Sequence, residues 1–290
     1  MDKVRRLIGC EAAYEKKIYG RGVGIAVLDS GVQKHMDLRG RVLVFQDYVN
    51  GKIRPYDDNS HGTHVAGIVV GSGARSNGKY MGVAPLSHLL VCKVLDSKGN
   101  GEIKGVLQAI DWIVKNRDTY KIRIINISVG ATPKENDRQE TELLQAVEYA
   151  WSQGIVVVAA AGNNGPETET ITTPGISRKI ITVGSYESIN KKQKVYSGRG
   201  PTGMCVMKPE VLSPGNEIIS CNGSNSYRKM TGTSMATPIV SGAIALLLEK
   251  HPDMTPKDVK YSLYKTAKDC GYPKYIQGWG LVDVKGLMKI

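Results

Sequence analysis

The sequence predicts an α/β fold, a three-layer α/β/α sandwich with a mostly parallel central sheet. Three observations lead to this fold class. Short runs of β-branched and apolar residues alternate with helical stretches along most of the 290 residues. Most of these runs are continuously apolar, which is typical of strands buried on both faces of a parallel sheet. No Pro/Ser-rich linker or repeat divides the chain, so we expect residues 1–290 to form a single domain.

The predicted strands are the apolar runs at residues 25–28, 90–95, 122–127, 155–160 and 180–183. The predicted helices cover residues 61–70, 103–116, 141–153 and 233–250. The last helix is apolar nearly all round, and Pro238 falls within its first turns, where a missing N–H costs least. This alternation implies right-handed βαβ connections. Functional residues of such sheets gather outside the carboxyl ends of the strands, so the residues there are candidates for chemistry.

Composition and charge exclude several classes of protein. Apolar residues make up 41% of the chain and charged residues 23%, as in an ordinary globular domain rather than a disordered chain. The 39 Lys and Arg exceed the 27 Asp and Glu, which gives a net charge of +12. This excess is scattered, and its densest cluster is Lys191, Lys192 and Lys194. Without a long run of like charges, we expect a solvated basic surface and no nucleic-acid partner.

Targeting signals and cysteines suggest where the protein works. No stretch approaches the roughly 18 apolar residues of a membrane span, so we expect no membrane partner. The first residues, MDKVRRLIGCEAAYEKK, lack the apolar core of a signal peptide, and no prodomain is visible. Five widely spaced cysteines argue against a disulfide framework and against a Cys-x-x-Cys metal site. We therefore expect a cytoplasmic protein, with the mature form of a secreted enzyme as the alternative.

Asp29 directly follows the first predicted strand, in the string GVGIAVLDSG. An acidic turn residue is common at such a position. The alternating Gly20, Gly22 and Gly24 suggest a dinucleotide site, but they precede the strand. A phosphate-binding loop instead follows a strand and opens a helix, so the dinucleotide interpretation is not favoured.

His61 begins a predicted helix in the string DDNSHGTHVAGIVVG, and His64 follows three residues later. Two nearby histidines suggest zinc. The metalloprotease motif, however, needs histidines at i and i+4 with a glutamate between them, and neither condition holds here. We expect His64 to be structural, while the role of His61 depends on the other residues at the strand ends.

Ser234 and Asn163 complete the candidates at the strand ends. Ser234 starts the last predicted helix, in GTSMATP, where it could be a simple N-cap. A helix N-terminus also favours developing negative charge. Asn163 follows the strand at residues 155–160, and on its own it could be a turn residue, because Asn164–Gly165 marks a turn.

Together these residues place a carboxylate, an imidazole, an amide and a hydroxyl at one edge of the sheet. The chain order Asp, His, Ser is one of those in which serine-protease triads occur. The strings VLDSG, HGTHVAG, INISVG, AAAGNNG and GTSMATP resemble the subtilase family of serine proteases, peptidase family S8. The resemblance runs from about residue 20 to about residue 281 and implies a subtilisin-like fold over that core.

The resemblance implies a serine endopeptidase that hydrolyses peptide bonds through an acyl-enzyme intermediate. It assigns Ser234 as the nucleophile, His61 as the general base and then acid, and Asp29 as the carboxylate that fixes the imidazole tautomer. The Asn163 side chain and the Ser234 backbone N–H would form the oxyanion hole. Ser30 resembles the neighbour that hydrogen-bonds the triad carboxylate, although a turn residue would look the same.

The resemblance also implies two segments that hold the substrate as an extended strand. One is Gly99, Asn100 and Gly101, and the other is Ser128, Val129 and Gly130. Backbone pairing of this kind is largely independent of substrate sequence. The specificity pocket would lie between residues 128–130 and 160–162, which contain no acidic residue. We therefore expect broad specificity, with large apolar or aromatic residues before the scissile bond rather than Lys or Arg.

Many subtilases hold a tight calcium ion between an Asp near the first strand and a loop inserted in the helix of the catalytic His. Asp37 matches that Asp, but the loop GSGARSNGKYMG brings Arg75 and Lys79 in place of oxygen ligands. We expect the strong calcium site to be absent, no cofactor to be required, and Asp37 to pair with one of the two cations.

Two other classes of function remain open at this point. An inactive relative could act as a peptide-binding scaffold, and a basic nucleic-acid-binding protein would account for the charge. Reaction with a fluorophosphonate probe separates an active serine peptidase from both. We expect a monomer that acts on peptide or protein substrates.

Overall fold

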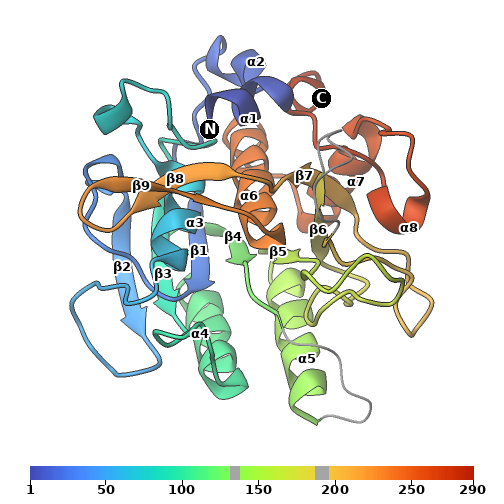
Figure 1. The fold of residues 1–290 in the computed structure, drawn as a ribbon, viewed down its shortest axis with the longest axis horizontal. Helices are drawn as coiled ribbons and strands as arrows, with labels where there is room; N and C mark the ends of the chain where they lie inside the picture. Colours follow the sequence, from blue (N-terminus) through green and yellow to red (C-terminus); the bar gives the residue numbers. More distant parts are fainter. Residues whose placement is uncertain (131–137, 187–195) are drawn as a thin grey trace.

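A seven-stranded parallel sheet forms the centre of the protein in the computed structural model, which describes residues 1–130, 138–186 and 196–290 (Figure 1). Every strand pair in this sheet is parallel. Its spatial order is β2 (Val42–Asp47), β3 (His88–Lys93), β1 (Gly24–Asp29), β4 (Ile122–Ile127), β5 (Val156–Ala160), β6 (Ile181–Tyr186) and β7 (Val211–Pro214). A separate antiparallel hairpin consists of β8 (Ile218–Asn222) and β9 (Ser226–Met230).

Helices cover both faces of this sheet, as the sequence predicts. α4 (Ile103–Lys115) and α5 (Arg138–Ser152) pack together on one face, whereas α3 (His61–Val70) and α6 (Thr233–Lys250) pack together on the other (Figure 1). The shorter helices are α1 (Asp2–Leu7), α2 (Glu11–Tyr14), α7 (Pro256–Thr266), α8 (Lys274–Gln277) and α9 (Val284–Leu287), with 3₁₀ turns η1 (Met36–Leu38) and η2 (Ala74–Ser76). The predicted three-layer α/β/α fold is confirmed.

Burial explains which elements the sequence predicts well. Every residue of β1 and β5 is buried, which is why these strands appear as continuous apolar runs. α6 is buried over nearly its whole length because it lies between the sheet and α3, and this accounts for a helix that is apolar all round. The predicted bounds of α3, α6 and β4 agree with the structure. Those of β1, β3, β5 and β6 differ by up to three residues.

The sequence does not predict β2, β7 or the hairpin of β8 and β9. β2 and β7 are the two edge strands; β2 is largely half-buried, and β7 has only four residues. β9 is mostly polar and half-buried or exposed. β7 and the hairpin lack the long apolar run that marks the central strands, whereas β2 begins with the run VLVF, which the sequence analysis missed.

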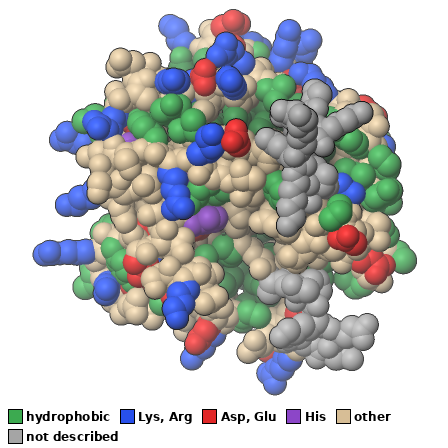
Figure 2. All heavy atoms as spheres, in the orientation of Figure 1, with side chains coloured by type: hydrophobic (Ala, Val, Ile, Leu, Met, Phe, Trp, Pro, Cys, Tyr) green, Lys and Arg blue, Asp and Glu red, His purple; other side chains and the backbone are tan. Residues whose placement is uncertain are grey.

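The surface agrees with a dispersed positive charge. Figure 2 shows Lys and Arg side chains spread around one face rather than gathered in one patch. The cluster of Lys191, Lys192 and Lys194 lies outside the described residues. Among the residues that the structure describes, no helix has the length and apolar character needed to cross a membrane.

Candidate active site

The fold brings the four candidate residues to one edge of the sheet. Asp29 ends β1, His61 is the first residue of α3, and Ser234 is the second residue of α6. Asn163 follows β5 after a short turn. His61, Asn163 and Ser234 line one open pocket of ≈ 350 Å³, and Figure 2 shows a histidine side chain near the middle of this face. The residues that the sequence predicts at the strand ends therefore lie together in one site.

A short hydrogen bond joins the imidazole to the buried carboxylate. His61 Nδ1 lies 2.7 Å from Asp29 Oδ1, and the Asp29 side chain is fully buried. Burial alone would lower the pKa of His61, but the charges of Asp29 and Asp57 and the hydrogen bond outweigh it and raise that pKa. A proton held on Nδ1 by Asp29 leaves the Nε2 lone pair available as a general base.

Ser30 hydrogen-bonds the Asp29 carboxylate through its backbone. Its backbone N–H donates to Asp29 Oδ1 at 2.7 Å, whereas its hydroxyl donates to Asp57 Oδ1 at 2.9 Å. The Ser30 hydroxyl also accepts from the N–H of Gly62 at 2.9 Å. Ser30 thus connects the end of β1 to the start of α3.

Asp57 is a buried residue of this site that the sequence analysis missed. Its carboxylate accepts five hydrogen bonds, from the hydroxyls of Ser30 and Thr63 and from the backbone N–H groups of Asn59, Ser60 and Thr63. Burial would raise the pKa of Asp57, but hydrogen bonds from Thr63, Ser60 and Asn59 outweigh it and lower that pKa. An Asp just before a predicted helix is the signal that could have identified it.

The consequence of this network is a fixed imidazole. Asp57 holds the left-handed backbone of Ser60, with φ of 75°, immediately before His61. Gly62 lies so close to Gly31 that a Cβ atom there would overlap the Gly31 carbonyl. The first turn of α3 therefore lies directly against the end of β1, where it meets Asp29.

The Ser234 hydroxyl lies in the same pocket as His61 but hydrogen-bonds a different group. It donates to the backbone carbonyl of Ser128 at 2.7 Å, and within the described residues it makes no hydrogen bond to His61. Catalytic hydrogen bonds of this type often form only in the substrate complex. Among the described residues the Ser234 backbone N–H has no acceptor, as expected in the first turn of a helix.

The amide of Asn163 has a defined orientation. Its Oδ1 accepts from the backbone N–H of Thr233 at 3.0 Å and from the Thr233 hydroxyl at 3.1 Å. Because the oxygen is held by two donors, the Nδ2 group is the end of the side chain left to donate. Asn163 is exposed in the pocket next to Ser234.

The two predicted substrate segments lie on the pocket to different extents. Gly99 lines it from one side, and Ser128, Val129 and Gly130 line it from another. Asn100 and Gly101 follow Gly99 but are not among the described lining residues.

Thr172 is a further lining residue that the sequence analysis missed. A Cβ atom at Gly130 or Gly162 would overlap its side chain, so both glycines are required there. Its buried hydroxyl makes no hydrogen bond within the described residues. Thr172 therefore brings an unpaired but uncharged polar group to this part of the pocket.

The expected ion pair of Asp37 is wrong. Asp37 is fully buried and forms no ion pair among the described residues. Its Oδ1 accepts the backbone N–H of Arg75 at 2.9 Å, and its Oδ2 accepts the Tyr227 hydroxyl at 2.8 Å. The Arg75 guanidinium instead bonds the Asn225 carbonyl at 2.5 Å.

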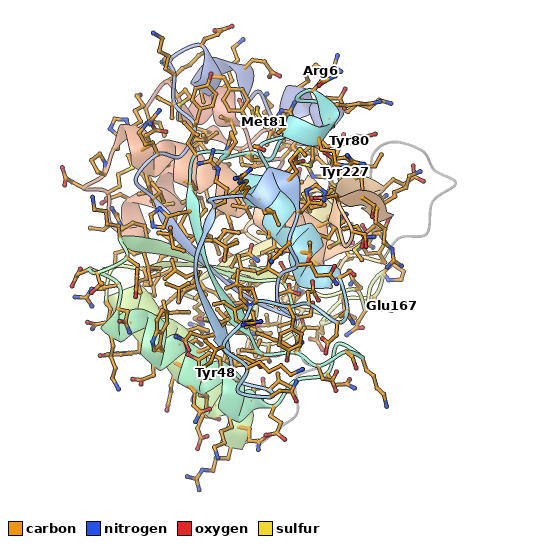
Figure 3. The ribbon with its side chains drawn as sticks, turned by 90° about the vertical axis from the view of Figure 1, so that its left-hand side faces the viewer. Arg6, Tyr48, Tyr80, Met81, Glu167 and Tyr227 are labelled. Carbon is orange, nitrogen blue, oxygen red and sulfur yellow. The ribbon has the colours of Figure 1, made fainter. Side chains whose placement is uncertain are left out.

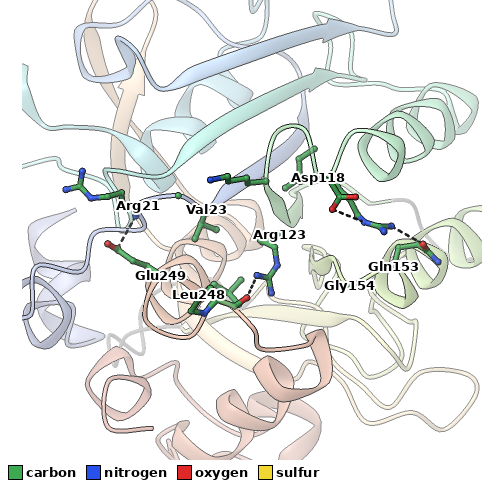
Figure 4. Close-up of a pocket in the computed structure, with 13 residues that line it drawn as sticks. Arg21, Val23, Asp118, Arg123, Gln153, Gly154, Leu248 and Glu249 are labelled. Carbon is green, nitrogen blue, oxygen red and sulfur yellow. Dashed lines mark hydrogen bonds and ion pairs between the residues drawn. The ribbon is translucent and has the colours of Figure 1, made fainter.

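A second, basic pocket lies at the opposite edge of the sheet, beside the first residues of β1 and β4 (Figure 4). Its volume is ≈ 500 Å³, and its basic lining residues are Arg21, Arg117, Lys121 and Arg123. Arg117 bonds Gln153 at 3.0 Å, and Arg123 bonds the carbonyls of Pro252 and Met254. This pocket contains none of the candidate catalytic residues.

Comparison with known proteins identifies the family. The family model described as "Subtilase family" matches residues 20–280. This chain belongs to the subtilase family. It is 42% identical over 290 residues to serine protease AprX of Bacillus subtilis (strain 168), a match that covers 89% of this chain and 65% of that protein. It is 35% identical over 282 residues to subtilisin DY of Bacillus licheniformis, which covers 96% and 95% of the two chains.

Solved subtilase structures share the fold. A cold adapted subtilisin-like serine proteinase superposes with a TM-score of 0.77 at 30% identity, over 92% of this chain and 90% of that one. Sphericase superposes with a TM-score of 0.79 at 30% identity, over 93% and 96%. The predicted family and serine endopeptidase activity are confirmed, with peptides or proteins as substrates. The expected cytoplasmic location gains no support from these relatives.

Replacing Asp57 by Asn tests its role in holding His61. We expect the acidic limb of the pH profile of kcat/KM to move to lower pH, because a charge that raises the His61 pKa is removed. Loss of hydrogen bonds to a charged group should also lower the free energy of unfolding by about 1–3 kcal/mol. The control variant Asp118→Asn changes an exposed carboxylate at the far edge of the sheet, and it should leave the acidic limb of the pH profile unchanged. A folded Asp57→Asn variant with an unshifted limb would contradict the assignment.

Proposed function

We propose that Asp29, His61 and Ser234 are the catalytic triad of this endopeptidase. The single observation that supports the proposal most is the 2.7 Å bond between Asp29 and His61 beside Ser234 in one pocket. In the first step the Ser234 Oγ attacks the substrate carbonyl carbon and His61 Nε2 takes the hydroxyl proton. His61 then gives this proton to the leaving amine, which breaks the C–N bond and leaves an acyl-enzyme. Water, deprotonated by His61, hydrolyses the ester.

The negative oxygen of each tetrahedral intermediate would be stabilised by two donors. One is Nδ2 of Asn163, which the bonds from Thr233 to Oδ1 leave free. The other is the backbone N–H of Ser234 at the start of α6, where the helix dipole also favours negative charge.

The substrate itself would release the nucleophile. An extended peptide pairing with Ser128–Gly130 presents a backbone N–H to the Ser128 carbonyl, which now accepts from the Ser234 hydroxyl. Competition for this carbonyl frees the hydroxyl to bond to His61. Gly99, Asn100 and Gly101 would flank the peptide on its other edge, and this arrangement explains broad sequence tolerance.

The Ser234→Ala variant tests the triad. We expect loss of labelling by a fluorophosphonate probe and a fall of about six orders of magnitude in kcat, as for subtilisin. Residual turnover would come from binding and the oxyanion hole alone. Peptide mapping of the labelled parent should place the probe on Ser234. Label on another serine, or full activity of pure Ser234→Ala protein, would contradict the proposal.

The Asn163→Ala variant tests the oxyanion hole. Because the amide would bond the oxygen mainly when it carries charge, kcat should fall about 10²–10³-fold, as for subtilisin, with little change in KM. Steady-state kinetics on one peptide substrate measure both constants. An increase in KM at unchanged kcat would instead assign Asn163 to ground-state substrate binding.

We also propose a preference for large apolar or aromatic residues before the scissile bond. The described lining residues include no acidic side chain, and burying a lysine there without an acidic partner would cost several kcal/mol. Cleavage of a peptide library should therefore favour Phe, Tyr, Leu and Met. Thr172→Asp should add preference for Lys and Arg, whereas Thr172→Val should not. A parent profile dominated by Lys or Arg would contradict this.

The residues at the place of the family's strong calcium site do not fit calcium. The guanidinium of Arg5, which is 9% exposed, donates to the carbonyls of Gly78 and Met81 in the inserted loop. Calcium needs six to eight oxygen ligands, so we propose that a side-chain cation stabilises this loop instead.

Adding calcium to chelator-treated protein should therefore leave the melting temperature nearly unchanged. A tight site would raise it by about 10 °C, because a bound ligand contributes several kcal/mol. Arg5→Gln should lower the free energy of unfolding by about 1–3 kcal/mol, since it leaves two partly buried carbonyls without their charged donor. Arg6→Gln, an exposed neighbour, is the control. A large calcium-dependent rise in the parent protein would overturn the proposal.

A further inference from the structure

We propose that His35, Asp37 and Cys221 form a binding site for a transition-metal ion of the zinc class. One ligand atom of each residue lies within 4.8 Å of the others. The three residues are buried, with exposures of 4% for His35, 0% for Asp37 and 1% for Cys221. The site rests on these side chains and is independent of the triad.

Two distant segments meet at this cluster. His35 and Asp37 flank the start of η1, in the loop that follows β1, and Cys221 lies in β8 of the hairpin. A Cβ atom at Gly67 in α3 would overlap the Cys221 side chain, so the cluster packs directly against the helix that begins with His61. A bound ion would therefore connect the loop after β1 to the hairpin, at a place where both lie against α3.

The imidazole has the tautomer that a ligand needs. Nε2 of His35 lies 3.0 Å from the carbonyl of Ser226, to which it must donate. Nδ1 carries the ring's lone pair and accepts the backbone N–H of Asp37 at 3.1 Å, so an ion bound at Nδ1 would displace this one hydrogen bond. Metal-bound histidines usually donate their other ring N–H to a carbonyl or carboxylate in this way.

The carboxylate lacks a compensating positive charge. Asp37 is fully buried, and among the described residues only neutral donors contact it: the backbone N–H of Arg75, the Tyr227 hydroxyl and, at 4.0 Å, the Cys221 thiol. A buried charge without a counter-charge is costly. A divalent ion beside Oδ2 would supply that charge.

The thiol completes the charge balance. Cys221 Sγ lies 4.0 Å from Asp37 Oδ2, so one ion can contact both atoms. On binding, the S–H bond breaks, its proton leaves to solvent, and bonds form from the ion to Sγ, to His35 Nδ1 and to Asp37 Oδ2. The ion contributes +2, the thiolate −1 and the carboxylate −1, so the occupied cluster is neutral and suited to burial.

The ligand types select the metal. A set of one sulfur, one nitrogen and one oxygen suits zinc or cobalt, whereas calcium and magnesium prefer oxygen alone. A water would take the fourth tetrahedral position. A pocket of ≈ 550 Å³, lined in part by His35, Met36 and Asn225, offers an entry path.

Aromatic packing supports the ligands from outside. Tyr227, which bonds Asp37, packs edge-to-face on Tyr80 with ring centroids 4.7 Å apart (Figure 3). It also packs edge-to-face on His35 at 5.3 Å. Tyr227 therefore orients two of the three ligands, as outer-shell residues of metal sites do.

Cobalt titration tests the proposal. The full chain with Ser234→Ala avoids self-digestion, and Co²⁺ is added after chelator treatment and removal of the chelator. We expect one equivalent to bind, one proton to be released, and a sulfur-to-cobalt charge-transfer band to appear in the near ultraviolet. Zinc should displace the cobalt and raise the melting temperature. Cys221→Ser should abolish the band, whereas Cys205→Ser, which removes an exposed thiol, should retain it.

Tyr227→Phe should weaken cobalt binding about 10–100-fold without removing the band. Circular dichroism checks that each variant folds. If Cys221→Ser does not fold, alkylation mapping of the parent provides the test, because cobalt should protect Cys221 but not Cys270 from a thiol reagent in mild denaturant. A parent protein without the band, or a band retained in folded Cys221→Ser protein, would overturn the proposal.

Discussion

The hydrogen bond between Asp29 and His61 requires two elements of different layers to meet within 2.7 Å. β1 lies in the middle of the sheet with every residue buried, so the position of its last residue is fixed by neighbours on both sides. α3 must then begin at that point. The five donors to Asp57 and the absence of a side chain at Gly62 allow it to do so.

Three buried carboxylates in this half of the molecule form no ion pair with Lys or Arg among the described residues. Asp29, Asp37 and Asp57 are each buried, and each is held by backbone N–H groups or hydroxyls. Asp29 Oδ2 has no hydrogen-bond partner among the described residues, so its charge is compensated chiefly at His61. This would favour the imidazolium of the proposed mechanism, since a poorly compensated carboxylate gains most from a new neighbouring cation.

Sequence patterns predicted those parts of the structure that depend on local periodicity and on the ends of strands. The central strands, α3, α6 and the positions of Asp29, His61 and Ser234 follow from continuous apolar runs and the rule that sites form at strand ends. Of the two edge strands, β7 lacks such a run, whereas β2 has one that the sequence analysis missed. The roles of Asp57, Thr172 and Arg5 depend on tertiary contacts, such as that of Arg5 with Met81, which no local pattern encodes. The same is true of Asp37, whose partner Tyr227 is 190 residues away.

His64 connects α3, the helix that begins with His61, to the hairpin of β8 and β9. Its Nε2 donates to the carbonyls of Ile218 and Arg228, one in each strand of the hairpin, and its own carbonyl accepts the Ser220 hydroxyl. Burial lowers its pKa to about 4, so it stays neutral and keeps this geometry at physiological pH. The hairpin leads directly into Gly232 and Ser234. His64 therefore connects the segment that leads into α6 to α3, so that one network of contacts positions both His61 and Ser234.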